Sequence, residues 1–78
     1  MNEDEKNYIN EMIKKDFSSY PLKRIQEILE DYGRDLSEKE VARVRVAILQ
    51  LSRYDLNRLK ALVIAAKADY KKILLWAE

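Results

Sequence analysis

Glycine and proline each occur only once in the 78 residues, and this scarcity constrains what the chain can fold into more than any other feature. Chain reversals favour these two residue types, whereas the leucine, alanine, glutamate, lysine, arginine and isoleucine that dominate here suit helices. Apolar residues also recur at helical spacing, as in Tyr8, Ile9, Met12 and Ile13. The sequence therefore predicts an all-α protein.

Local signals divide the chain into helices. Pro21 favours an end to the first helix and a start for the second, and Gly33 suits the left-handed position after a helix. Ser52 and Asp55 prefer helix ends to interiors and indicate a further break, although one continuous bent helix is an alternative there. We predict a compact bundle of four helices, the last one longest, at about residues 3–17, 20–32, 38–51 and 55–77.

The strongest local signal precedes the third predicted helix. Ser37 and Glu40 have the spacing of a capping box, in which each side chain bonds the other residue's backbone amide. Leu36 and Val41 flank this pair and have the spacing of a hydrophobic staple. The pattern predicts that this helix starts close to Ser37.

The length predicts one domain over residues 1–78 with a thin core, because a chain this short buries only about 60% of its unfolded surface. The chain has no cysteine and no histidine, which leaves no disulfide and removes the main ligands of structural zinc. We expect no metal and no cofactor, and we expect stability to come from helix packing or from association with another chain.

Catalytic patterns are absent as well. Without histidine or cysteine the usual bases and nucleophiles are few, and one glycine cannot build a phosphate-binding loop. The segment from Asp31 to Ser37 superficially has the composition of a calcium loop. Its sixth position is Leu36 instead of glycine, and its twelfth is Ala42 instead of glutamate. We expect neither an enzyme nor a small-molecule substrate.

Neither a membrane segment nor a signal peptide is evident. No apolar run approaches the length of about 18 residues that a membrane helix needs. The first six residues are acidic and polar, unlike a signal peptide. We therefore expect a cytoplasmic protein without a membrane partner.

Charge is distributed unevenly along the chain. Residues 1–40 hold seven Lys and Arg against eleven Asp and Glu, a net charge of −4, and residues 41–78 hold eight against three, a net charge of +5. The two halves could pair within one fold, or the basic half could bind nucleic acid weakly. The candidate nucleic-acid contacts are Arg43, Arg45, Arg53, Arg58 and Lys60.

The second half also carries more apolar surface than a small bundle would cover. Helices that are apolar around much of their circumference are buried, and apolar patches left exposed mark interfaces. The alternative is that the first two helices cover all of this surface. We predict a protein–protein interaction or self-assembly module, with a homodimer as its simplest form. The candidate interface residues are Ile64, Leu75 and Trp76, followed by Val46 and Leu49.

The second half resembles small uncharacterised bacterial proteins that are all-helical and have no assigned activity. The resemblance covers residues 41–78 and rests on the following motifs: Arg43-Val44-x-x-Ala47-Ile48-Leu49-x-Leu51-Ser52, Asp55-Leu56-x-x-Leu59, Ala66-Lys67-x-Asp69-Tyr70 and Trp76-Ala77-Glu78. It implies an all-helical fold and small residues at the turn, where this chain has Arg53 and Tyr54. It implies no activity and no functional residue.

Overall fold

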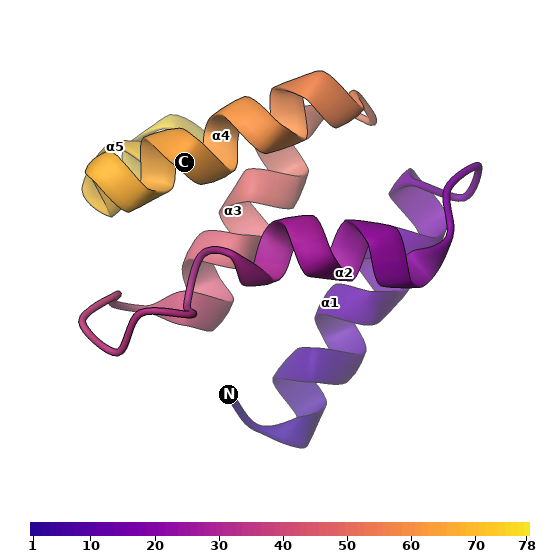
Figure 1. The fold of residues 1–78 in the computed structure, drawn as a ribbon, viewed down its shortest axis with the longest axis horizontal. Coiled ribbons are helices and arrows are strands. Elements are labelled where there is room, and N and C mark those ends of the chain that lie inside the picture. The colour runs from indigo at the N-terminus through magenta and orange to yellow at the C-terminus, as the bar shows by residue number, and fades with distance from the viewer.

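A computed structural model describes the whole chain, Met1–Glu78, and contains five α-helices and no strand (Figure 1). The helices are α1 (Glu3–Asp16), α2 (Leu22–Glu30), α3 (Val41–Ser52), α4 (Leu56–Ala68) and α5 (Tyr70–Ala77). The all-α prediction is confirmed, whereas the predicted count of four helices is wrong. The expected last helix is divided in two, so the longest helix is α1, with 14 residues.

Asp69 divides the expected last helix. Its backbone is extended, its amide donates to the Ala65 carbonyl at the end of α4, and its carboxylate accepts from the Lys71 amide at the start of α5. Aspartate is poor in helix interiors because its side chain bonds nearby backbone groups, and for the same reason it is a good N-cap. Asp69 was therefore the local signal for this break, in a stretch whose apolar periodicity continues on both sides.

The predicted break between α3 and α4 is confirmed, so these are two separate helices. Asp55 is the N-cap of α4, and its carboxylate accepts from the Arg58 amide at 3.1 Å. Arg53 and Tyr54 before it both have left-handed backbones, with φ of 49° and 69°. Such conformations favour glycine, which gives a physical reason for expecting small residues at this turn.

The predicted capping box before α3 is wrong. The helix begins at Val41, Glu40 before it has a left-handed backbone and makes no side-chain cap, and Leu36 is fully exposed. Glu38 organises this segment instead. One oxygen of its carboxylate accepts from the amides of Gly33 (2.7 Å) and Asp35 (3.2 Å). The other oxygen accepts from Nζ of Lys67 on α4 at 2.9 Å, so a contact distant in sequence outweighs the local pattern.

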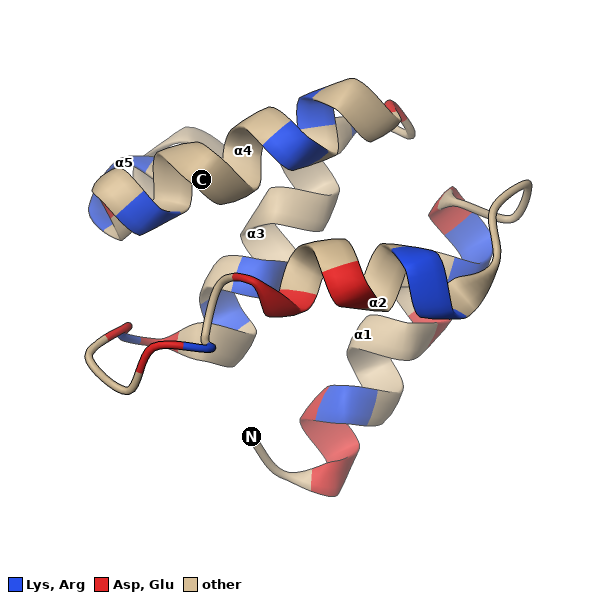
Figure 2. Ribbon diagram, viewed as in Figure 1, with Lys and Arg blue, Asp and Glu red and all other residues tan.

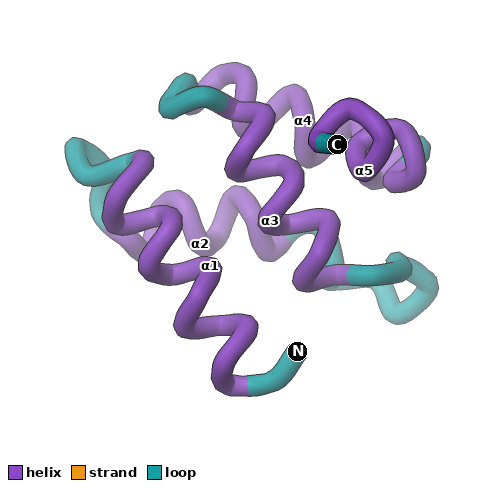
Figure 3. Tube along the Cα trace, turned by 180° about the vertical axis from the view of Figure 1, so that it is seen from behind, coloured by secondary structure: helices purple, strands orange, loops and turns teal.

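The helices form two layers. Figures 1 and 3 show α2 and α4 on one side of the molecule and α1, α3 and α5 on the other. Within the second layer α3 lies between α1 and α5 (Figure 3). Because α3 packs against α1, α4 and α5, it is the central helix of the fold.

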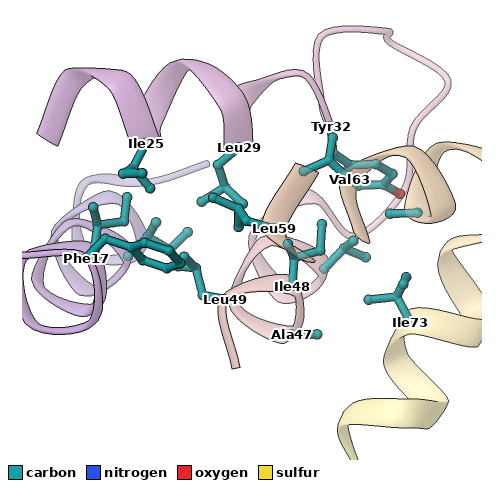
Figure 4. Close-up of a cluster of buried hydrophobic side chains, with 14 residues drawn as sticks. Phe17, Ile25, Leu29, Tyr32, Ala47, Ile48, Leu49, Leu59, Val63 and Ile73 are labelled. Atoms are coloured by element: carbon teal, nitrogen blue, oxygen red, sulfur yellow. The ribbon is translucent and has the colours of Figure 1, made fainter. Parts of the chain in front are cut away.

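The core lies between the layers and draws on all five helices (Figure 4). Its 14 buried apolar residues include Val44 and Ile48 of α3, neither of which is accessible to solvent. The ring of Tyr32 is buried among them, and its hydroxyl donates to the Lys39 carbonyl at 2.7 Å. Every buried side-chain nitrogen or oxygen has a hydrogen-bond partner, as a stable interior requires.

Candidate functional site

An open groove of about 570 Å³ lies on the layer formed by α1, α3 and α5. Its lining includes Ala42 and Val46 from α3, Tyr8 from α1, and Leu74 and Ala77 from α5. In this layer α3 lies between the other two helices (Figure 3), so α3 provides the floor and α1 and α5 the walls. The outer face of α3 is thus only partly covered by its neighbours.

The charged residues that line the groove are mainly acidic. Asp4 and Glu5 come from the first turn of α1, and Glu78 follows the last turn of α5. Glu5 also forms a capping box with Asn2, in which each side chain accepts from the other residue's amide. Arg43 is the one basic residue in the lining, and it forms an ion pair with Glu40 at 2.9 Å. The groove therefore combines apolar lining residues with a net negative charge.

Beside the groove, the outer side of α5 exposes a mixed basic and apolar surface. Leu75 and Trp76 remain 65% and 56% exposed, and Lys71 and Lys72 are exposed one turn earlier. Residues four apart lie on the same side of a helix, which aligns Lys71 with Leu75 and Lys72 with Trp76. We call these four residues the α5 edge.

The structure separates the five predicted interface residues. Leu75 and Trp76 are exposed on the α5 edge, and Val46 lies on the floor of the groove. Ile64 is 70% exposed but lines a depression shared with α2, in the opposite layer. Leu49 is 1% exposed and points into the core (Figure 4), so it cannot contact a partner directly. Helical periodicity grouped Leu49 with Val46, and only the packing of the neighbouring helices separates them.

Tyr8 and the acidic residues of the groove were not among the predicted site residues. The spacing of Tyr8 placed it on the core stripe of the first helix, whereas it is 57% exposed. The second apolar face of α3, which includes Ala42 and Val46, was the one sequence signal for a surface of this kind. No local sequence pattern indicates that α1 and α5 lie on either side of this face of α3.

The five predicted nucleic-acid contacts differ in their exposure and in the acceptors that they bond within the protein. Arg45 is half-buried, and its guanidinium donates to the carbonyls of Tyr32 (2.8 Å) and Glu30 (3.4 Å) at the end of α2. Removal from water lowers the pKa of Arg45, although an arginine stays charged. Arg58 donates to the Leu51 carbonyl at 2.8 Å, and Arg43 pairs with Glu40. Arg53 and Lys60 are exposed on the surface of the second half.

The acidic and basic halves meet through one long-range ion pair. Lys67 of α4 lies 2.9 Å from Glu38, and its Nζ also donates to the Asp31 carbonyl at 2.9 Å. The other two ion pairs, Lys14–Glu11 and Arg43–Glu40, join residues three apart. Figure 2 shows Lys and Arg on all five helices, and Asp and Glu on α1, α2 and the segment after α2. Most charged residues of both halves are exposed to solvent.

Stability is expected to fall in acid because of Glu38. The hydrogen bond from Lys67, followed by those from the Gly33 and Asp35 amides, lowers the pKa of Glu38 in the folded state. A lowered pKa stabilises the fold above the unfolded value of about 4.3, and this contribution is lost as the pH falls through the folded value. Glu38→Gln should reduce the free energy of unfolding at pH 7 by about 1 kcal/mol or more and flatten its decline in acid.

Urea unfolding at a series of pH values from 7 down to 3 measures both effects. Asp35 remains in the variant, and its pKa is also lowered by hydrogen bonds from the Ser37 amide and hydroxyl, so some slope persists. A variant as stable as the wild type, with the same dependence on pH, would show that Glu38 does not hold this segment.

Neither a metal site nor a membrane-spanning helix is present among the five helices and their connections. No group of three or more acidic side chains lies close enough together to hold a metal ion. None of the five helices is both long and apolar enough to cross a membrane.

Comparison with protein-family models, with curated proteins and with solved structures gives no match to this chain. The resemblance of residues 41–78 to small bacterial helical proteins therefore stays a prediction.

Proposed function

We propose that this protein is a non-catalytic association module that forms a homodimer through the surface around α5. One observation carries the proposal: Leu75 and Trp76, adjacent on α5, remain more than half exposed beside an apolar groove. Burying a large apolar side chain is worth about 1.5–3 kcal/mol, and tryptophan is enriched among residues that dominate binding energy. Single exposed apolar residues are ordinary, whereas a patch beside a groove is typical of an interface.

The size of the chain supports self-association. Only 15 of its 78 residues are buried, so the isolated fold rests on a small core. Domains of this size gain stability from disulfides, metals, close helix packing or association, and a chain without cysteine or histidine is left with packing and association. A two-fold dimer is the simplest closed assembly of identical chains.

The proposal predicts that a polar residue at position 75 or 76 weakens the dimer. We expect Trp76→Gln to raise the dissociation constant about 30-fold or more, because an interfacial anchor of about 2 kcal/mol is lost. Light scattering during size-exclusion chromatography, over a range of protein concentrations, measures this. The wild type should approach twice the chain mass of 9.3 kDa, and the variant should return to the single chain mass.

Ile64→Gln is the matched control, since Ile64 is exposed to a similar degree but lies in the opposite layer. It should keep the dimer. Circular dichroism verifies that both variants fold. If Trp76→Gln and Leu75→Gln both keep the wild-type mass at all concentrations, the interface lies elsewhere.

Weak nucleic-acid binding is the alternative function, and one observation favours it. Three residues, 53–55, separate α3 from α4, which is the turn length of a helix-turn-helix. Arg53, Arg58 and Lys60 surround this turn and the start of α4. Against it, Arg43, Arg45 and Arg58 already donate to acceptors within the protein. Fluorescence anisotropy with labelled duplex DNA and RNA at low salt tests it, and an absence of binding there rules it out.

A further inference from the structure

We infer that the groove between α1, α3 and α5 is the receptor for the α5 edge of a second copy of this chain. The inference rests on the proposed homodimer and specifies how its two copies meet. In this arrangement Leu75 and Trp76 of each copy lie in the groove of the other. The interface is therefore reciprocal, with the same contact made twice.

The two surfaces match in charge. The lining of the groove includes the apolar side chains of Tyr8, Val46 and Leu74 and the acidic residues Asp4, Glu5 and Glu78. The α5 edge presents Leu75 and Trp76 together with the exposed Lys71 and Lys72. An apolar and basic ridge thus faces an apolar and acidic depression, and such complementarity selects the partner and its register.

The position of the two surfaces favours a closed dimer. Both belong in part to α5, since Leu74 and Ala77 line the groove while Leu75 and Trp76 point away from it. A two-fold axis at the last turn of α5 brings each edge to the other copy's groove at the same time. Surfaces far apart on one molecule would instead generate a ring or a filament.

The same axis places opposite charges together. When two α5 helices run antiparallel across an axis at Leu75, Lys72 of one copy lies opposite Glu78 of the other. Lys71 and Lys72 belong to the first turn of α5, where the positive end of the helix dipole disfavours cations. Carboxylates from a second copy would offset this local disadvantage.

Charge reversal tests the contact directly. The groove variant carries Asp4→Lys with Glu78→Lys, and it keeps Glu5 because Glu5 caps α1. The edge variant carries Lys71→Glu with Lys72→Glu. Each variant alone has like charges on its edge and its groove. The dissociation constant of its homodimer should therefore be at least about 10-fold higher than that of the wild-type homodimer. Circular dichroism establishes that both remain helical.

Mixing the two variants is the decisive step. The groove variant has a basic edge and a basic groove, whereas the edge variant has an acidic edge and an acidic groove. In a two-fold heterodimer, the basic edge of the groove variant therefore meets the acidic groove of the edge variant. The acidic edge of the edge variant likewise meets the basic groove of the groove variant, so both contacts join opposite charges. An equimolar mixture should therefore restore wild-type dimer affinity, with the heterodimer identified by native mass spectrometry. A single chain with all four substitutions should also dimerise. If both variants keep the wild-type affinity, or if mixing restores nothing, the groove does not receive the α5 edge.

The outcome for the wild type separates this inference from the proposed function. A wild-type monomer at every concentration would overturn the homodimer and this contact together. A wild-type dimer that withstands both charge reversals would retain the homodimer and overturn only the contact.

Cysteine cross-linking gives a readout independent of charge reversal, because the chain has no cysteine of its own. We expect a chain with Lys72→Cys and a chain with Glu78→Cys to form a mixed disulfide under mild oxidation. If each chain couples only to itself, or no disulfide forms, the antiparallel α5 contact is wrong.

Discussion

Replacing Gly33 by alanine should destabilise the fold by about 2–5 kcal/mol, combining backbone strain with steric overlap. Gly33 has a φ of +107°, a conformation that residues with a Cβ rarely adopt. An added Cβ would lie 2.6 Å from Cγ1 of Val41 and 2.8 Å from Nη2 of Arg45. Both neighbours are constrained, since Val41 begins α3 and Arg45 is bonded to carbonyls at the end of α2.

Urea unfolding followed by circular dichroism measures this loss. It is large compared with the total stability of a chain this short, about 4–12 kcal/mol at 0.05–0.15 kcal/mol per residue. The double variant Gly33→Ala with Val41→Ala removes the closest overlap and leaves the strained backbone, so it should regain part of the loss relative to Val41→Ala alone. A Gly33→Ala protein within about 0.5 kcal/mol of the wild type, the usual range of surface changes, would contradict the strain argument.

Ile48→Ala is expected to cost about 3–4 kcal/mol, because deleting a fully buried isoleucine leaves a cavity as well as losing apolar burial. Ile48 has no exposed surface and lies on the central helix, which packs against α1, α4 and α5. The surrounding helices hold one another in place and can only partly close the cavity. The free energy of unfolding from urea titration provides the measurement.

Ile64→Ala is the control of identical chemistry. Ile64 is 70% exposed, so its truncation should change stability by no more than about 1 kcal/mol. Both variants are measured at several protein concentrations, because dimer formation makes apparent stability depend on concentration. Equal losses at the two positions would mean that Ile48 does not occupy the core described here.

Helix ends show how far local sequence patterns reach. Asp55 was predicted to prefer a helix end and is the N-cap of α4, because its carboxylate needs only the amide three residues ahead. Gly33 was predicted to follow the second helix in a left-handed conformation and has a positive φ. Asp69 has the same capping chemistry, yet continuous apolar periodicity on both sides concealed that break.

The capping box failed for a different reason. Ser37 and Glu40 have the right spacing, but Ser37 donates to Asp35 and Glu40 pairs with Arg43. Glu38, between them, bonds Lys67, which is 29 residues away. A pattern read within six residues cannot take account of an acceptor or donor that the fold supplies from another helix.

At the candidate site, too, some features follow from sequence patterns and others only from the packing of the helices. Leu75 and Trp76 were predicted as candidate interface residues from the excess apolar surface of the second half, and both are exposed. Leu49 and Val46 could not be distinguished by periodicity, and the structure buries the first and leaves the second on the groove floor. The groove itself has no sequence signature, because its walls come from residues near opposite ends of the chain.

By itself the sequence determined the helical nature of the chain, most of its helix ends and the presence of excess apolar surface. These properties depend on side chains acting on their own backbone or on neighbours within about one turn. The tertiary structure alone decided which apolar face is buried, which charges are bonded internally and where a groove opens. Those outcomes depend on how separate helices pack. Packing brings together side chains that are distant in sequence, and their spacing along the chain does not predict the contact.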